Sequence, residues 1–263
     1  MPATYRDAPL LKPPVWTWEI PIYFFVGGLA GAASVIAAAA QFSGLALDDL
    51  VRDAKRIAVA GALVSPLLLI SDLGRPARFL NMLRVFKLQS PMSIGVWTLV
   101  IFSGAAIAAL LPLGLIATLA TVVAAIAGAI LATYTGVLIG ATAIPVWARN
   151  VDILPIHFGA SGLGAAVSML ELLGHRTSAM NALGLIAAGV ELLVIFALTR
   201  RRSSGGPLMH GAEVLSGPGA LVLRLAAISM PPMQIAAAVI PLVGSLLTRF
   251  AWIDAGRRSV SRG

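Results

Sequence analysis

Charge is scarce in this sequence. Asp, Glu, Lys and Arg make up 11% of its 263 residues, whereas hydrophobic residues make up 59%. A soluble domain is usually about half apolar and about a quarter charged, so these few charges cannot cover a water-facing surface of normal size. Several uncharged runs also reach the roughly 20 residues that cross a hydrocarbon core, and they are far longer than the strands of a membrane barrel. The composition therefore predicts an all-α, polytopic transmembrane helix bundle.

Cysteine is absent altogether. The chain therefore has no disulfide framework and no thiolate ligands for zinc or an iron–sulfur cluster. The three histidines, His157, His175 and His210, fall at the ends of apolar runs or in a loop. A haem held by two histidines needs both at a similar depth inside the membrane, so we expect no haem and no metal site. Nothing resembles a P-loop, a metalloprotease motif or a nucleophile elbow.

The formal net charge is +8, but the basic residues cluster at the ends of the apolar runs. This distribution is typical of membrane topology and of contact with anionic lipid head groups, so we expect membrane lipid and no nucleic acid as a partner. The first apolar run, residues 20–47, is too long for the hydrophobic part of a signal peptide and is expected to remain as the first span.

Seven crossings are expected, with a short half-helix before the last of them. The predicted spans are residues 15–44, 57–73, 91–111, 113–147, 154–174, 178–199 and 234–252. Residues 217–229 are too short to cross alone, and Pro231 and Pro232 interrupt the helix that follows, since proline breaks a helix interior. An eighth crossing requires a different use of the residues around this double proline. We expect one integral membrane domain over 1–263, with a first helix group in 1–147 and a second in 148–263.

The side of the membrane on which the chain begins is called the N-terminal side below. With seven crossings it carries ten Lys and Arg residues, against seven on the opposite side. The bias favours a cytoplasmic N-terminal side, because cytoplasmic loops carry an excess of basic residues.

Small residues recur every fourth position in the fourth predicted span, at Gly128, Ala132, Gly136 and Gly140. Such ridges let helix backbones approach each other closely in membranes. Gly27 and the glycine four residues later repeat the pattern in the first span. We interpret both ridges as packing devices and assign them no chemistry.

The stretch "SDLGRPARF", residues 71–79, concentrates charge where the second span ends. Asp72 is expected at or just inside the edge of the hydrocarbon, and Gly74 ends the helix. Arg75 lies close enough in sequence to pair with Asp72, and Arg78 follows three residues later. Two interpretations are open: a helix stop with an interfacial ion pair, or a functional carboxylate at membrane depth.

Other polar residues fall at a similar depth on the N-terminal side. Glu19 and Tyr23 share one face of the first span, because they are four residues apart. Tyr134, Glu191 and His157 lie in the fourth, sixth and fifth predicted spans, respectively. A lone tyrosine in a span is often only a packed residue, but ionisable residues inside the membrane are functional candidates by default. Their convergence predicts a pocket for a ligand with a polar head, or a proton path into one.

Five stretches, in this order along the chain, resemble the NrfD/PsrC family, the integral membrane subunits of polysulfide-reductase-like respiratory complexes. They are "WTWEIPIYFFVGGLAGA" (16–32), "SDLGRPARF" (71–79), "SPMSIGVW" (90–97), "YTGVLIGATAIPVW" (134–147) and "RFAWIDAG" (249–256). The resemblance implies a subunit without haem that binds a quinone or quinol near the membrane face where a ferredoxin-like iron–sulfur subunit docks. That partner often leads to a molybdopterin catalytic subunit, and the location implied is a bacterial or archaeal inner membrane.

The resemblance also carries roles onto single residues. The family's quinone site draws on polar residues early in the first span and on the tyrosine of the fourth, which correspond here to Glu19 and Tyr134; Asp72 and Arg75 lie on the same face. Some members have Asn or His near the start of the first span, where this chain has Glu19 and Tyr23, so ligand orientation or proton handling differs.

Our hypothesis is a membrane anchor that exchanges electrons between menaquinone or ubiquinone and a partner iron–sulfur subunit, and is thus an enzyme only as part of a complex. Glu19, Tyr23, Tyr134 and His157 would contact the quinone. Glu19 and Asp72 would take up or relay protons, with Arg75 keeping Asp72 ionised. Glu191 would belong to a second relay toward the opposite side.

An ion- or proton-conducting transporter without a redox partner is the alternative function. Its polar residues should continue to the opposite side, where the predicted spans place Glu171, and Asp254 with Arg249. A purely structural anchor is a third possibility, against which the polar stripe around Glu191 argues.

Overall fold

The computed structural model describes residues 14–74, 76–84, 86–201 and 206–261, and all regular structure in these ranges is helical. The first half of the chain contains α1 (Glu19–Phe42), α2 (Asp48–Leu73), α3 (Pro76–Leu83), α4 (Pro91–Leu110) and α5 (Leu115–Gly140). The second half contains α6 (Pro145–Ala148), α7 (Leu154–Leu172), α8 (Ser178–Arg200), α9 (Pro207–Ser216), α10 (Pro218–Ser229) and α11 (Met233–Ser261).

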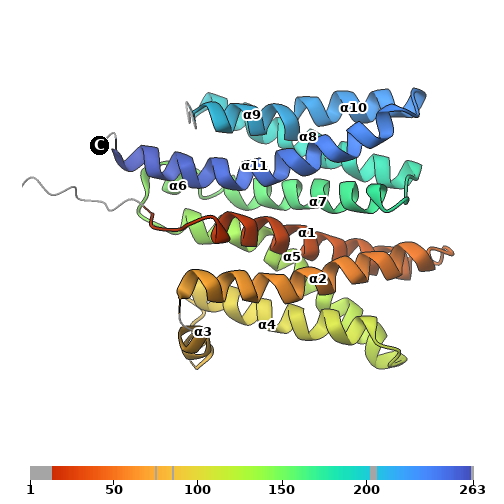
Figure 1. The fold of residues 1–263 in the computed structure, drawn as a ribbon, viewed down its shortest axis with the longest axis horizontal. Helices are drawn as coiled ribbons and strands as arrows, with labels where there is room; N and C mark the ends of the chain where they lie inside the picture. Colours follow the sequence, from red (N-terminus) through yellow and green to blue (C-terminus); the bar gives the residue numbers. More distant parts are fainter. Residues whose placement is uncertain (1–13, 75, 85, 202–205, 262–263) are drawn as a thin grey trace, which may run out of the picture.

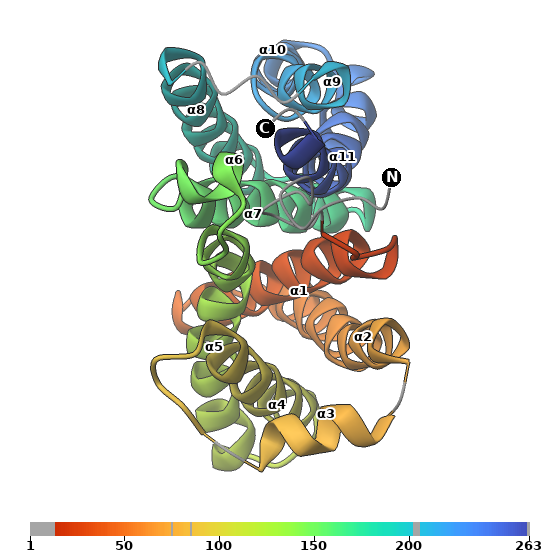
Figure 2. The same cartoon turned by 90° about the vertical axis from the view of Figure 1, so that its left-hand side faces the viewer.

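The long helices lie side by side and run back and forth between the same two ends of the molecule (Figure 1). Viewed along their length, α1, α2, α4 and α5 gather on one side and α7 to α11 on the other, with α3 across one end of the first group (Figure 2). Contacts of α7 with α1 and α5, and of α11 with α1, join the two groups. The assignment of the whole chain to one domain stays a prediction.

The all-α, polytopic bundle is confirmed. Seven helical segments are long and apolar enough to cross a membrane: α1, α2, α4, α5, α8, α11, and α9 with α10 as one unit over Pro207–Ser229. The eighth rod, α7, runs alongside them and carries His157 and Glu171, which lower its hydropathy. The chain is therefore an integral membrane protein with seven to eight spans.

The expected half-helix is wrong in its length. Residues 217–229 do form a short helix, α10, but α9 lies end to end with it across Gly217, and the two together reach from one end of the bundle to the other (Figure 1). Pro231 and Pro232 lie in the turn between α10 and α11, where proline disrupts no helix, as the sequence predicts.

Because α9 and α10 together add one crossing, the last helix runs in the direction opposite to the one expected. Helix α11 therefore ends on the side where α1 begins (Figure 1). Arg257 and Arg258 therefore lie on the N-terminal side, whereas the seven expected crossings would end the chain, and with it these two arginines, on the opposite side; that expectation is wrong. Among the described residues, the N-terminal side carries Arg78, Arg84, Lys87, Arg149, Arg200, Arg201, Arg257 and Arg258. The opposite side carries Arg52, Lys55, Arg56 and Arg176. The charge asymmetry is thus stronger than the sequence alone predicts.

The end of α2 explains the glycine of "SDLGRPARF". Gly74 adopts a left-handed conformation, with φ of 67°, and its N–H donates to Ser71 O at 3.2 Å. Glycine adopts this conformation without a steric penalty, so it is a common end to a helix. Arg78 Nη1 donates to Leu73 O at 3.2 Å and so satisfies another carbonyl at the same helix end. Arg75 lies outside the described residues.

A proline inside α2 is matched by a serine on α4. Pro66 has no N–H, so the carbonyl of Ala62, four residues earlier, loses its helical donor. Ser103 Oγ donates to Ala62 O at 3.1 Å and replaces that donor. In the membrane, such freed backbone groups must be satisfied by neighbouring helices.

Ser103→Ala is therefore expected to lower the free energy of unfolding by about 1 kcal/mol, since it leaves a carbonyl without a partner. In a Pro66→Ala background the helical N–H is restored, and the same substitution should cost about half as much or less. Thermal denaturation of the four detergent-purified proteins measures the difference. Equal losses in both backgrounds would contradict this account.

The glycine ridges pack as the sequence predicts. A Cβ at Gly31 would lie 2.3 Å from Gly128 O, so α1 and α5 cross with their backbones in contact. In the same way, a Cβ at Gly136 would lie 2.5 Å from the backbone of Leu154 at the start of α7. A third close approach joins α1 to α7, where a Cβ at Gly162 would lie 2.9 Å from Gly28 O.

Candidate functional site

A cavity of about 150 Å³ lies near the N-terminal side, among α1, α2, α4 and α5. Tyr23, Asp72 and Tyr134 supply its polar atoms, so three of the residues that the sequence singles out do come together here. The rest of the lining is apolar or aromatic: Trp16, Ile20, Phe24, Leu69, Leu73, Met82, Met92, Val96 and Leu138. The cavity is therefore a hydrophobic chamber with a few polar groups, the usual character of a small-molecule site.

Two buried tyrosines face this cavity. Tyr23 is 3% exposed and Tyr134 6%. A buried tyrosine combines an apolar ring with a hydroxyl that can donate and accept hydrogen bonds, and both of these tyrosines line the cavity. Tyr134 packs its ring so closely on α4 that a Cβ at Gly95 would lie 1.9 Å from its Cζ and 2.1 Å from its hydroxyl oxygen. Glycine at position 95 thus fixes the place of the Tyr134 hydroxyl.

Two carboxylates lie near each other at this end of the bundle, and one of them lines the cavity. Asp72 lines it, and Glu19 is close enough to Asp72 for their charges to repel each other. The Glu19 carboxylate accepts a hydrogen bond from the hydroxyl of Thr17 and does not itself line the cavity. Within the described residues, Asp72 has no ion-pair partner, because Arg78 is bonded to a backbone carbonyl instead.

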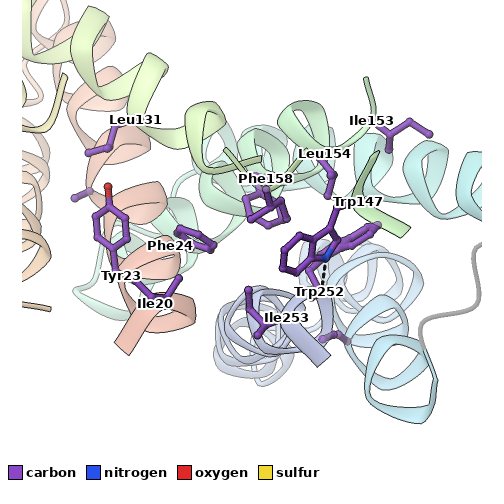
Figure 3. Packing of buried hydrophobic residues seen from close by; sticks show 14 of the residues in the cluster. Ile20, Tyr23, Phe24, Leu131, Trp147, Ile153, Leu154, Phe158, Trp252 and Ile253 are labelled. Carbon is purple, nitrogen blue, oxygen red and sulfur yellow. Dashed lines mark hydrogen bonds between the residues drawn. The ribbon is translucent and has the colours of Figure 1, made fainter. Parts of the chain in front are cut away.

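An aromatic wall bounds the cavity toward the second helix group (Figure 3). Phe24 packs on Phe158 of α7 at 6.1 Å between ring centroids, and Trp16 stacks on Trp147 of α6 at 5.5 Å. Trp147 Nε1 donates to Trp252 O of α11 at 2.8 Å, the dashed line in Figure 3. The wall is therefore built from both helix groups and held by one buried hydrogen bond.

His157 lies behind this wall and not in the cavity. Its ring packs beside Phe158 and edge-on against Trp252, with centroids 6.2 and 6.0 Å away. Its Nε2 is 3.7 Å from Glu191 Oε2. The structure thus separates His157 from Tyr134, with which the sequence groups it, and places it beside Glu191.

His157, Glu191 and Arg249 form a buried triad among α7, α8 and α11. Arg249 is 0% exposed; its Nη2 donates to Phe158 O at 2.9 Å, and its guanidinium lies 3.9 Å from the centre of the Phe158 ring. Glu191 Oε2 accepts a hydrogen bond from Ser216 Oγ at 3.1 Å. The three groups lie at similar depth, in the half of the bundle that is nearer the N-terminal side of the membrane.

The triad keeps unused hydrogen-bonding capacity. Glu191 Oε1, both ring nitrogens of His157, and Nε and Nη1 of Arg249 are buried without a hydrogen-bond partner among the described residues. Leaving a buried polar group unpaired costs about 1–3 kcal/mol, and more for a charged one. Such a site is suited to ordered water and to proton exchange.

The sequence interpretation misplaces one buried arginine of the second helix group and overlooks another. The sequence places Arg249 near the opposite side with Asp254, but α11 runs toward the N-terminal side, where Asp254 pairs with Arg258 at 2.8 Å. It does not single out Arg224, because residues 217–229 are too short to cross alone. A single arginine within an otherwise apolar run is the signal that points to it.

An exposed ion pair lies on the N-terminal side. Arg201 donates to both carboxylate oxygens of Asp152 at 2.7 and 2.8 Å and to Arg149 O at 3.0 Å, so it joins the end of α8 to the loop before α7. This hydrogen-bonded guanidinium lowers the pKa of Asp152 to about 2, and the carboxylate is charged at neutral pH. Within the residues that the structure describes, no cluster of His, Asp or Glu is arranged to hold a metal ion.

Comparison with known proteins gives two matches. The model of the family described as "Polysulphide reductase, NrfD" matches residues 8–203, most of the sequence. The protein is also 30% identical over 193 residues to the C subunit of the polysulfide reductase of Wolinella succinogenes. That alignment covers 61% of this protein and 58% of the relative, so little more than half of the relative's length is matched. The family match includes the cavity and Glu191 and ends before α9.

Proposed function

The chain belongs to the NrfD family, and on that premise we propose that it is the quinone-reactive membrane subunit of a multi-subunit respiratory oxidoreductase. Membership supports the coarser statement that it is a membrane subunit of a reductase-type complex. The observation that carries the finer statement is the cavity itself, in which two buried tyrosines, Tyr23 and Tyr134, and one carboxylate, Asp72, stand in an otherwise apolar and aromatic lining.

The cavity suits a quinone ring. A protein cavity of about 150 Å³ lined by apolar side chains admits a benzene ring. The apolar lining would hold the faces of the ring, and the hydroxyls of Tyr23 and Tyr134 would bind its oxygens. Either menaquinone or ubiquinone fits this description, because both combine a ring bearing two oxygens with an apolar tail.

Proton handling is assigned to the carboxylates on the same side. A bound quinol supplies two electrons and two protons when it is oxidised. Asp72 lines the cavity and would accept a proton, and Glu19, whose charge acts on Asp72, would pass it on. His157 and Glu191 lie beyond the aromatic wall. His157 is therefore too far from the cavity to contact the quinone ring.

A partner must carry the electrons away or deliver them. The chain contains no cysteine and therefore no iron–sulfur cluster of its own. We assign this role to a ferredoxin-like iron–sulfur subunit that docks on the N-terminal side, where the cavity is, and that leads on to a molybdopterin catalytic subunit. We assign this side to the cytoplasm of a bacterial or archaeal cell, because its excess of basic residues supports that orientation.

Tyr134→Phe is expected to slow electron exchange with quinol about tenfold, the effect of losing one hydrogen bond to the ring. The complex is purified gently from its native membrane through a tag on this chain. Reduction of the co-purified iron–sulfur clusters by a menaquinol or ubiquinol analogue is then followed by EPR without oxygen. Tyr23→Phe should act in the same direction.

Thr133→Val is the matched control, since it removes a hydroxyl from the neighbouring, half-buried residue of the same helix, which does not line the cavity. It should leave the reduction rate unchanged. Native rates in the Tyr134→Phe complex would exclude the cavity as the quinone site. A native chain that purifies with neither cluster nor bound quinone would overturn the redox function and favour the transporter.

A further inference from the structure

A second cavity, of about 420 Å³, lies toward the opposite side of the membrane between α8, α10 and α11. The turn from α7 to α8 and the turn from α10 to α11 lie at this end of the bundle (Figure 1). Its volume falls within the range of about 300–1,000 Å³ that is typical of small-molecule sites. The polar part of its lining consists of Glu171, Arg176, Thr177, Ser178, Asn181 and Gln234.

The start of α8 presents hydrogen-bond donors at this cavity. Thr177 caps the helix, and its Oγ1 accepts a hydrogen bond from Met180 N at 3.2 Å. The N–H groups of the two helical residues in between have no partner within the helix. Arg176 directly precedes the cap, and its Nε donates to Glu171 O at 3.1 Å, which uses one of the N–H donors of its guanidinium. A guanidinium beside a helix N-terminus favours an anion such as a phosphate group.

The carboxylate of Glu171 is a second, independent sign of a ligand. Its side chain is 7% exposed and lines the cavity, and its Oε1 accepts a hydrogen bond from Arg224 Nη1 at 2.9 Å. Its Oε2 is buried without a hydrogen-bond partner in the described part of the chain. Because a buried acceptor without a partner is costly, the cavity suits a ligand that brings an O–H or N–H donor.

The charges around the cavity leave one cation without a counter-charge. Glu171 and Arg176 are the charged residues of its lining. Arg224 is 1% exposed and balances Glu171 in an ion pair, whereas the side chain of Arg176 is bonded to a backbone carbonyl. A ligand that neutralises the cavity therefore carries one negative charge.

The rest of the cavity is apolar and reaches the lipid-facing surface. Its lining there is formed by Ala182 and Leu185 of α8, Ala227 and Ile228 of α10, and Ala237 of α11. Ile228 is 65% exposed, and Ala182 is also exposed, so both are covered by hydrocarbon chains when the protein is in a membrane. A ligand that fills the whole cavity therefore combines a polar, anionic head with an apolar tail.

We propose that this cavity binds one anionic phospholipid with a hydroxyl-bearing head group, of the phosphatidylglycerol type, from the leaflet on the opposite side. The phosphate lies between the guanidinium of Arg176 and the first N–H groups of α8. A head-group hydroxyl donates to Glu171 Oε2, and one acyl chain follows the apolar lining between α8 and α10. Basic pockets between membrane helices are known to bind lipid head groups. The site lies at the other end of the bundle from the quinone cavity and goes beyond the proposed function, because it involves no quinone.

Arg176→Gln is the variant that tests the site. The complex is purified through the tag on this chain, washed free of lipid with detergent and titrated with phosphatidylglycerol, and native mass spectrometry counts the lipids bound. The first lipid should bind the variant at least ten times more weakly than the native complex, because a charge-assisted hydrogen bond to the phosphate is lost. Equal affinities would overturn the proposal.

Arg52→Gln is the matched control. It makes the same change at an exposed arginine on the same side of the membrane, outside the cavity. This variant should bind the first phosphatidylglycerol as tightly as the native complex does. If both variants lose affinity to the same extent, the lipid is attracted by the general charge of this surface, and the site in the cavity is refuted.

Two further probes use the native complex and so do not depend on a variant that folds. Phosphatidylcholine has the same phosphate and acyl chains, but its head group has no net charge and no hydrogen-bond donor. It should bind at least ten times more weakly than phosphatidylglycerol. Inorganic phosphate at millimolar concentration should leave phosphatidylglycerol bound, because it gains nothing from the apolar lining.

Equal binding of phosphatidylcholine would refute the anionic, donor-bearing head group. Displacement of the lipid by inorganic phosphate would refute the phospholipid in favour of a free phosphate. Reduction of the clusters by quinol is measured separately, so failure of the quinone function does not affect the reading of these lipid titrations.

Discussion

Gly31→Ala is expected to yield little folded protein, and what folds should have a much lower melting temperature. A Cβ at this position would lie 2.3 Å from Gly128 O and 3.0 Å from Gly128 C, which are backbone atoms that no side-chain rotation can move aside. Helices α1 and α5 would have to separate along their crossing. Overpacking of a core costs about 1–3 kcal/mol even where side chains can adjust, so we expect a loss of about 3 kcal/mol or more.

Gly104→Ala is the matched control for this substitution. It makes the same change on α4, where a Cβ would meet nothing within 4 Å. Because alanine is favoured over glycine in a helix by about 1 kcal/mol, this variant should melt at or slightly above the native temperature. Thermal melts in detergent compare the two variants, and similar midpoints would show that the α1–α5 crossing yields more easily than its geometry indicates.

Arg249→Met is expected to destabilise the protein by about 3–5 kcal/mol. The substitution removes the one cation of the buried triad, whose charge acts on the Glu191 carboxylate, and a buried carboxylate left without a compensating cation is costly. It also removes the hydrogen bond to Phe158 O and the contact with the Phe158 ring. Chemical or thermal denaturation in detergent measures the loss.

Glu191→Gln added to Arg249→Met should restore a large part of this stability, because the uncompensated charge is gone. Double-mutant analysis of the two substitutions gives their coupling energy, expected between 0.5 and about 3 kcal/mol for groups in one network. Strictly additive losses would mean that Arg249 acts through its contacts with Phe158 alone. The triad would then be a packing feature rather than an electrostatic one.

The sequence predicts the membrane depth of polar residues better than it predicts which of them lie next to each other. Because helix ends have local signals, the end of α2 at Gly74 and the position of Asp72 near the membrane edge follow from composition. The sequence places Tyr23, Asp72 and Tyr134 at one depth on different helices, and one cavity does bring them together. His157 has the same depth but belongs to a different cluster, since the rotation of α7 and the ring of Phe158 are tertiary features without a local signal.

The sequence does not predict the α9–α10 rod, for a related reason. Each of its helices is too short to span a membrane, and Gly217 with Pro218 is a typical break between elements. Packing against α8 and α11 supports the two pieces in this end-to-end arrangement. The same error reverses the expected direction of α11, and with it the side on which Arg249 and Asp254 are placed. One misjudged break thus alters several later assignments.

The close backbone contact between Gly28 of α1 and Gly162 of α7 determines how a movement of one helix group affects the other. Where two backbones touch without intervening side chains, there is nothing soft to absorb a displacement. Tyr23 lies five residues from Gly28 on α1, and Glu171 lies nine residues from Gly162 on α7. If α1 tilts when the cavity fills, the direct backbone contact between Gly28 and Gly162 would therefore move α7 as well. Chemistry in the first helix group would then reach the second as mechanical strain, with neither an electron nor a proton crossing the aromatic wall between them.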